Sequence, residues 1–406
     1  MEQVVIGSFF GKYNEGSPID AQLHIYEDGG CSLKADDIFS EGDNIWEDYL
    51  LGDDEQGRRY SLLGVSYKTK VSVSIGGSRK SELFPRLMVV GDRHIKSIDS
   101  ITIDTFSVRL DCDSWFYENS YYASQKYIPP HLRPAFELKY DETTNIGLSS
   151  QRDMATGKRV TVAVFKAGHP QGLKYFQDAV HYLVTFLSFA CRSALPHGGI
   201  TFRDAEGFEY ELHYKPAFYP GDKESNNNLF NYKVSDLQGK FTRWMGLYDK
   251  APAIFKLYFL ARLIKLESTV RFLMATQALE CFNRKFHNEK LTFVERAKDI
   301  IEGEGYHAIL SQVGGVEQIG NLHLLIRDTR NYFTHYNEDL KHNSDEQGLF
   351  FLTFKVELLL DLYLLAEIGF TSDEFEAIKY PVIDDRFNRR ENLHRDYFNS
   401  DAEAQR

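Results

Sequence analysis

The chain has 406 residues, which is too long for one ordinary domain, so two or three domains are expected. Its formal net charge of −12 leaves no broad basic surface, which argues against generic electrostatic binding of nucleic acid. Any nucleic-acid contact would therefore come from a local cleft. The four cysteines are scattered and form no C-x-x-C pair. This pattern is typical of intracellular proteins and excludes a disulfide framework or a zinc site.

The N-terminus lacks the basic region and the apolar region of a signal peptide. The most apolar run, Leu349–Phe370, contains Lys355, Glu357, Asp361 and Glu367. Charges repeated through its centre predict a buried helix and not a membrane span. We therefore expect a cytoplasmic protein without a membrane partner.

Residues 1–215 are typical of a β-rich α+β domain with one substantial helix. Short runs rich in β-branched residues are separated by turn signals, and apolar residues at steps of three and four predict a helix over Gly172–Ala194. The polar stretch Lys215–Asn228 indicates that residues 216–250 connect this domain to the next. The predicted strands are Val4–Ile6, Ala21–Tyr26, Val71–Ile75, Leu87–Val90, Ser100–Asp104, Val160–Phe165, Gly199–Phe202 and Tyr210–Tyr214.

Residues 251–380 have helical character, so the fold class is a multidomain α+β protein whose second domain is all-α. Residues 381–406 form a polar tail. Pro252 suits a first helical turn, Ser268 is expected to cap the second helix, and Gly369 is expected to end the apolar helix. The predicted helices are Pro252–Leu266, Ser268–Phe282, Thr292–Glu302, Val316–Arg330, Leu349–Ile368 and a short one from Ser372.

The sequence Arg330-Asn331-Tyr332-Phe333-Thr334-His335 lies near the end of one of these helices. A histidine can take or give a proton near neutral pH. An arginine stays charged and offers a fork of donors that fits phosphate oxygens. These are the groups that a metal-independent ribonuclease needs. The same spacing also arises by chance, as a surface arginine and a capping histidine, so the helical context decides between the two interpretations.

Arg330 continues the apolar stripe of its predicted helix, so its charge is expected to face a groove or a partner. His335 is five residues further on, about 140° around an ideal helix. The two groups converge on one phosphate only if the helix loosens after Phe333 or if a second chain shares the site. The polar run Thr334–Glu338 favours a helix end there.

This arrangement resembles the HEPN superfamily (higher eukaryotes and prokaryotes nucleotide-binding), whose signature is R-x(4–6)-H at a helix end in an α-helical bundle. Residues 330–335 fit the R-x4-H form, including the polar residue after the arginine. The flanking Leu325–Thr329 and the Phe272–Glu280 segment are similar to the ApeA-like subgroup. The β-rich domain in front looks like the N-terminal domain of ApeA-type bacterial anti-phage proteins, on architecture and not on a specific motif.

The resemblance implies an endoribonuclease that needs no metal or cofactor and cleaves RNA with two motifs brought face to face, hence a homodimer through the HEPN domain. In that role His335 acts as general base or acid, Arg330 holds the scissile phosphate, and Asn331 orients His335 or contacts phosphate. The products would be a 2′,3′-cyclic phosphate and a 5′-hydroxyl, and transfer RNA is one candidate substrate. Glu280 is a candidate partner of Arg330, or else forms a helix-face salt bridge.

Residues 1–215 would then be a sensor or regulatory domain that restrains the nuclease until an unknown phage trigger arrives, and the outcome would be abortive infection. An alternative stays open, because some HEPN domains are non-catalytic. In that case the N-terminal domain recognises a phage component, and the helical domain only binds nucleotides or dimerises.

Overall fold

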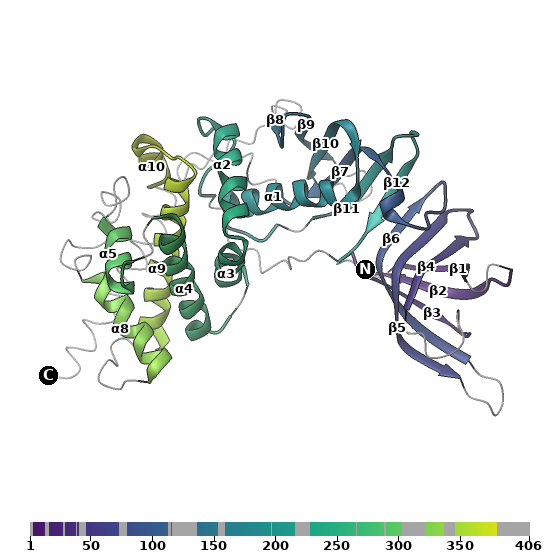
Figure 1. The fold of residues 1–406 in the computed structure, drawn as a ribbon, viewed down its shortest axis with the longest axis horizontal. Helices are drawn as coiled ribbons and strands as arrows, with labels where there is room; N and C mark the ends of the chain where they lie inside the picture. The colour runs from purple at the N-terminus through teal and green to yellow at the C-terminus, as the bar shows by residue number, and fades with distance from the viewer. Residues whose placement is uncertain are drawn as a thin grey trace. The chain divides into compact units, whose positions relative to one another are not determined.

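A computed structural model of the chain describes residues 3–12, 16–26, 29–37, 39, 46–72, 79–112, 115, 136–152, 159–195, 197–215, 228–264, 266–287, 290–302, 321–336 and 346–379. The chain divides into two compact units. The first comprises residues 1–113, 130–184 and 196–219, and the second comprises residues 114–129, 185–195 and 220–406. The division falls inside helix α1 (Leu173–Cys191) (Figure 1).

The first unit is built on one antiparallel sheet whose first half closes into a barrel of six strands. Within that half the order is β3-β2-β1-β4-β5-β6, and β3 also pairs with β6, which closes the ring. Each of the six strands therefore has a neighbouring strand on both sides, which limits the open edge along which another chain could pair. The six strands are β1 (Gln3–Gly11), β2 (Ile19–Ile25), β3 (Cys31–Ala35), β4 (Trp46–Asp54), β5 (Arg59–Ser72) and β6 (Arg79–Gly91).

The sheet continues from β6 through six further strands, in the order β12-β11-β7-β10-β9-β8. The first turns of α1 cover this half, and Phe176 of α1 stacks on Phe106 of β7 with ring centroids 5.3 Å apart. A short 3-10 helix, η1 (Ile98–Ser100), precedes β7. The strands are β7 (Ile103–Leu110), β8 (Phe136–Lys139), β9 (Thr144–Arg152), β10 (Arg159–Gln171), β11 (His197–Asp204) and β12 (Glu209–His213).

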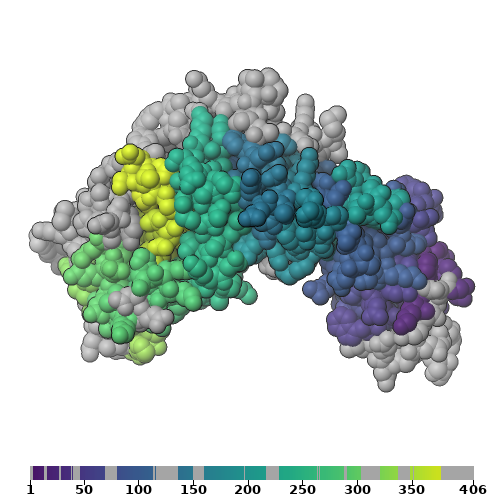
Figure 2. All heavy atoms as spheres, turned by 45° about the horizontal axis from the view of Figure 1, so that its top comes forward, coloured from purple at the N-terminus to yellow at the C-terminus, as the bar shows by residue number. Residues whose placement is uncertain are grey.

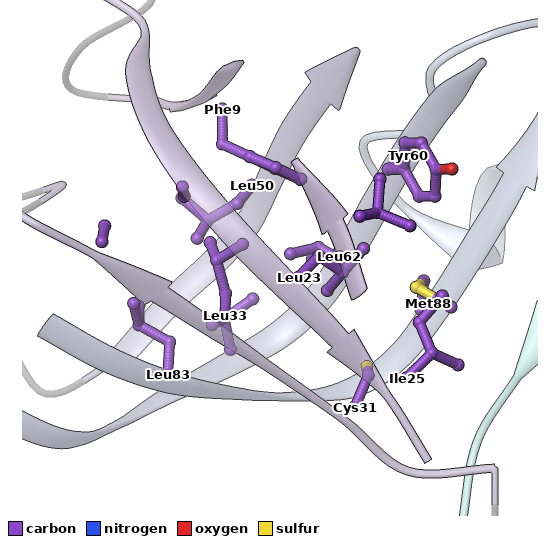
Figure 3. Close-up of a cluster of buried hydrophobic side chains, with 14 of the residues drawn as sticks. Phe9, Leu23, Ile25, Cys31, Leu33, Leu50, Tyr60, Leu62, Leu83 and Met88 are labelled. Atoms are coloured by element: carbon purple, nitrogen blue, oxygen red, sulfur yellow. The ribbon is translucent and has the colours of Figure 1, made fainter. Parts of the chain in front are cut away.

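Alternation of apolar and polar residues along the strands fills the barrel, because successive side chains on a strand point to opposite faces. Leu23, Leu33, Leu50 and Leu62 come from four different strands and meet in the interior with no exposed surface (Figure 3). Gly52 is required beside them, because a Cβ there would lie 2.3 Å from the ring of Phe9. The barrel is therefore a packed core and not an open channel.

The second unit is helical, and α4 is its centre. This helix contacts α3, α5, α8 and α9, which is why residues of α4 can meet side chains from several parts of the sequence. In the view of Figure 2, a yellow strip from the last helices lies beside the teal-green surface of the helices that precede them. The helices are α2 (Leu237–Lys250), α3 (Pro252–Leu263), α4 (Ser268–Phe286), α5 (Phe293–Glu302), α8 (Leu322–His335), α9 (Glu346–Glu367) and α10 (Ser372–Lys379).

A buried ionic network joins α9 to its neighbours. Glu357 is only 1% exposed and accepts hydrogen bonds from Arg262 of α3 at 2.9 Å and from Arg271 of α4 at 2.5 and 2.9 Å. One turn along, Asp361 accepts from the hydroxyl of Tyr258 at 2.7 Å. Because a buried carboxylate is costly unless it is paired, these contacts fix how α3, α4 and α9 pack.

Most of the predicted elements are confirmed, with local corrections. The apolar run is the buried helix α9, and Gly369 follows it with φ +88°, as the helix-end prediction requires. The cap of α4 was predicted wrongly: Glu267, and not Ser268, occupies the N-cap and accepts from the amides of Thr269 and Val270. The strand predicted over Ser100–Asp104 begins only at Ile103, because η1 occupies the residues before Ile101.

Several predictions fall outside the described residues. These are residues 216–227 of the predicted connecting segment, residues 73–75 of one predicted strand, residues 316–320 at the start of the motif helix, and the tail. The rest of the predicted connecting segment contains α2, a helix that the sequence reasoning missed. The missed strands include β3, β4, β8 and β9.

Candidate functional site

Helix α8 carries the complete Arg330–His335 motif. It remains regular through His335 and ends at Tyr336, which adopts the left-handed conformation with φ 51° while its N–H donates to the carbonyl of Tyr332 at 2.8 Å. The helix end therefore falls within the polar run Thr334–Glu338, as expected, but the helix does not loosen after Phe333, which was one of the two arrangements left open. On a continuous helix, Arg330 and His335 lie about 140° apart around the axis and about 7.5 Å apart along it. One copy of α8 thus presents the two groups on different faces.

Arg330 is held by residues of two other helices. Its Nη2 donates to Oε2 of Glu280 on α4 at 3.0 Å. Its guanidinium carbon lies 4.5 Å from the ring centroid of Phe293 on α5, within the range of a cation–π interaction. The side chain is 24% exposed, so one part is fixed against the bundle while another part can meet a ligand. The sequence predicted that this charge faces a groove or a partner and not open water, and in the structure Arg330 contacts Glu280 and Phe293.

Glu280 bridges two arginines. Its Oε1 accepts from Nη2 of Arg284, one turn further along α4, at 2.5 Å, while Oε2 accepts from Arg330. The Glu280 side chain is only 9% exposed, so pairing with cations offsets the cost of burying its charge. The two roles weighed for Glu280 are thus both present, as a partner of Arg330 and as a helix-face salt bridge. Two guanidiniums against one carboxylate leave a net charge of +1.

The aromatic platform under Arg330 is set by the start of α5. Thr292 and Glu295 form a capping box: the Thr292 N–H donates to Glu295 Oε2 at 2.7 Å, and the Glu295 N–H donates to Thr292 Oγ1 at 3.4 Å. The hydrogen bond from the Thr292 N–H lowers the pKa of Glu295, so the carboxylate stays charged at the helix start. The box fixes Phe293 as the first residue of α5, which places its ring beside Arg330.

His335 is the last residue of α8 and is exposed, whereas Asn331 is half-buried. The two lie four residues apart and therefore on the same side of the helix. Next to them, the rings of Tyr332 and Tyr336 stack with centroids 5.8 Å apart. The structure thus groups Asn331 with His335 and groups Arg330 with Glu280, but it does not bring the two groups together within one chain.

No group of three or more His, Cys, Asp and Glu side chains that could hold a metal ion occurs among the described residues. His323, on the first turn of α8, has a lowered pKa because of partial burial and then the nearby charges of Lys298 and Arg327. No helix in the described part of the chain is long and apolar enough to cross a membrane.

The first unit also has a hollow of about 550 Å³, on the outer surface of the sheet where β6, β12, β11 and β7 adjoin. Its lining mixes signs, with Arg58 and Arg203 beside Glu209 and Glu211. Both arginines already pair with carboxylates, Arg58 with Asp54 at 2.9 Å and Arg203 with an aspartate at 3.2 Å. The hollow therefore indicates no single class of ligand.

Two family models match the chain. ApeA N-terminal domain 1 matches residues 5–246, which is more than half of the sequence, and Apea-like HEPN matches residues 273–374. This chain is an ApeA-like HEPN protein. No curated protein and no solved structure matched it. The second match contains Glu280, Arg284, Phe293, Arg330 and His335, so the whole constellation lies inside the HEPN domain.

Membership of this family implies an anti-phage role of the nuclease type, and HEPN domains generally dimerise and act on RNA. Sequence reasoning missed Arg284 and Phe293. A signal for both was present, because Glu280 and Arg284 have i,i+4 spacing and Thr292-x-x-Glu295 is a capping-box pattern. Neither pattern says that the two elements meet at Arg330.

Proposed function

We propose that this ApeA-like HEPN protein is a metal-independent endoribonuclease of a bacterial anti-phage system, which stops phage growth by abortive infection. The observation that carries the proposal is Arg330, held by Glu280 and Phe293 in the HEPN bundle, with His335 about 1.4 turns further along the same helix. A guanidinium held in this way meets a phosphate with little loss of side-chain freedom, which favours binding of a charged transition state.

The chemistry proposed for the site is attack of a ribose 2′-hydroxyl on the adjacent phosphate. His335 takes the proton of that hydroxyl, or gives a proton to the leaving 5′-oxygen. Arg330 binds the non-bridging oxygens and offsets the charge that grows on them. Asn331, on the side of α8 that also carries His335, orients the imidazole or contacts phosphate. The products are a 2′,3′-cyclic phosphate and a 5′-hydroxyl.

The active form that we propose is a homodimer in which the ends of two α8 helices meet. Because α8 stays helical through His335, one chain does not direct Arg330 and His335 at the same phosphate. A two-fold axis near the motif would place the His335 of one chain opposite the Arg330 of the other. In a two-fold interface, when one residue contacts a second residue of the other chain, the reverse contact forms as well, so the site would occur twice. Support comes from the exposure of His335 and from the general tendency of HEPN domains to dimerise.

We also propose that the N-terminal domain recognises a phage component and restrains the nuclease in uninfected cells. A nuclease that was always active would be toxic to its own cell, so a restraint is required. Transfer RNA is the substrate that we favour, because a structured RNA can reach a local cationic site without a broad basic surface. The cluster of net charge +1 around Glu280 is such a local site in a chain of net charge −12.

A second candidate function is a non-catalytic HEPN module that only dimerises or binds nucleotides. The separation of Arg330 from His335 along α8 favours it, because the pair is not assembled within one chain. Under this alternative the guanidinium of Arg330 stabilises the bundle through Glu280 and Phe293. It predicts that Arg330 and His335 matter no more than their neighbours in a phage-plaquing assay.

The test is RNA cleavage by the full chain in EDTA, with transfer RNA and with an unstructured RNA, and with Arg330→Ala and His335→Ala. Helix α8 supplies matched controls, because Arg327 and His323 have the same side chains and lie outside the motif. We expect both motif variants to lose cleavage and both controls to retain it. Equal activity in all four variants would refute the assignment of Arg330 and His335 to the site. If wild type neither cleaves RNA nor arrests growth during phage challenge, the proposal that the protein is an endoribonuclease is refuted.

A further inference from the structure

Arg284 shares the Glu280 carboxylate with Arg330 but lies nearer to solvent. The Arg284 side chain is 55% exposed, compared with 24% for Arg330 and 9% for Glu280. The carboxylate of Glu280 is therefore the most buried group of the cluster. The guanidinium of Arg330 is more exposed, and that of Arg284 is the most exposed. Each arginine uses Nη2 to bind Glu280, and a guanidinium has five N–H groups in total. Each therefore has further N–H groups that can bind phosphate oxygens.

The charges explain why a second arginine is needed. Arg330 and Glu280 alone would form a neutral pair, which attracts a phosphate only weakly. Arg284 pairs with the other oxygen of the same carboxylate and brings the cluster to a net charge of +1. Because Glu280 is nearly buried, solvent does not screen it from its partners as it would an exposed carboxylate. The bridge also fixes the spacing of the two guanidiniums.

We propose that Arg284 is a second phosphate-binding residue, which holds the phosphodiester next to the scissile one, while Glu280 is a positioning residue for both arginines. The proposal rests on the proposed ribonuclease function, because it takes Arg330 as the ligand of the scissile phosphate. An RNA strand would then cross the site from the more exposed Arg284 to the less exposed Arg330. The competing role for Arg284 is a salt bridge that stabilises the last turn of α4.

The decisive measurement is how RNA binding depends on salt. A phosphate contact in single-stranded nucleic acid changes the slope of log affinity against log salt by about 0.7, whereas a salt bridge inside one helix does not. The full chain with His335→Ala serves as the parent, so that the probe survives. The probe is a fluorescein-labelled single-stranded RNA of about 20 nucleotides, followed by anisotropy from about 50 to about 200 mM KCl.

Adding Arg284→Ala should weaken binding about three- to tenfold at the lowest salt and make the slope shallower by about 0.7. Arg284→Lys should keep most of the slope, because it keeps the charge. Lys298→Ala is the matched control, since Lys298 forms an exposed i,i+4 pair with Glu302 on α5 and its loss changes the net charge equally. That variant should keep the parental slope.

Equal slopes for Arg284→Ala and Lys298→Ala would overturn the second phosphate subsite, and a lowered melting temperature with an unchanged slope would assign Arg284 to helix stability.

A cleavage assay of the Arg284→Ala variant with His335 restored separates the phosphate subsite from the ribonuclease proposal. RNA binding that responds to Arg284 without any cleavage would overturn the ribonuclease and keep the phosphate subsite. Cleavage with an unchanged KM in Arg284→Ala would overturn the subsite and keep the ribonuclease. Failure of the parent to bind the RNA would overturn both.

Discussion

Replacing Glu280 by glutamine tests how Arg330 is held, and it should move binding and turnover in opposite directions. Glutamine has nearly the same shape, but it has one carbonyl oxygen and one NH2 group where glutamate has two acceptors. Because Arg284 and Arg330 bind different oxygens of Glu280, a glutamine in the same conformation can accept from only one of them. The NH2 group then faces the other guanidinium as a second donor, so one of the two contacts at 2.5 and 3.0 Å is lost.

The magnitudes follow from the burial and the charge of the cluster. A hydrogen bond to a charged group contributes about 1.5–3 kcal/mol, and the 24% exposure of Arg330 lets water replace part of that. We therefore expect the helical unit to lose about 1–2 kcal/mol of unfolding free energy. The net charge of the cluster rises from +1 to +2. At a separation of about 7 Å in water-like surroundings, an added charge attracts a phosphate by about 0.6 kcal/mol, or about threefold in affinity.

The assay compares RNA affinity with single-turnover cleavage in the same variant. Glu280→Gln should bind RNA about threefold more tightly at low salt and cleave it at least about tenfold more slowly, because Arg330 has lost part of its fixed position. Glu302→Gln is the control, since it makes the same charge change at an exposed pair on α5. Unchanged turnover with tighter binding would refute the positioning role. Weaker binding would refute the charge argument.

Two further predictions concern stability. Glu357→Gln should lower the unfolding free energy by about 3–5 kcal/mol in chemical denaturation, because the buried Arg262 loses its hydrogen-bonded carboxylate and keeps only the more distant Asp361 at 3.7 Å; a loss below about 1 kcal/mol would contradict the buried network. Burial lowers the pKa of His181, so the stability that its neutral form contributes is present above the unfolded pKa of about 6.5 and is lost as the pH falls through the lowered folded pKa. His181→Gln should therefore flatten the fall of melting temperature below about pH 6.5, and an unchanged pH profile would contradict this.

The fold class could be read from the sequence because its signals are local. Alternating residues mark the strands, and steps of three and four mark the helices, without knowledge of the partner elements. Closure of the barrel depends instead on the pairing of Leu33 with Leu83, and strand pairing at such a distance along the chain has no local signature. The error at the start of α4 has a different, local cause, because the longer side chain of Glu267 reaches the free amides that Ser268 was expected to satisfy.

In the candidate site, too, the features within one helix were predictable from the sequence, and the contacts between helices were not. Arg330 and His335 belong to one helix, so their spacing alone predicted that they lie on different faces of it. Glu280 was found as a candidate because it lies on a helix of recognisable character. The roles of Arg284 and Phe293 depend on how α4, α5 and α8 pack against one another, and the sequence patterns that place these residues describe only their own helices.

The continuity of α8 bears on where control of the proposed nuclease acts. Arg330 is already fixed by α4 and α5, whereas His335 stands exposed at the end of the helix. Bringing both to one phosphate within a single chain would require unwinding the last turn of α8, with the loss of its backbone hydrogen bonds. Approach of a second chain requires no such change. The smaller cost favours assembly of two helix ends as the regulated step, so a trigger at the N-terminal domain would act on how two copies meet and not on the motif itself.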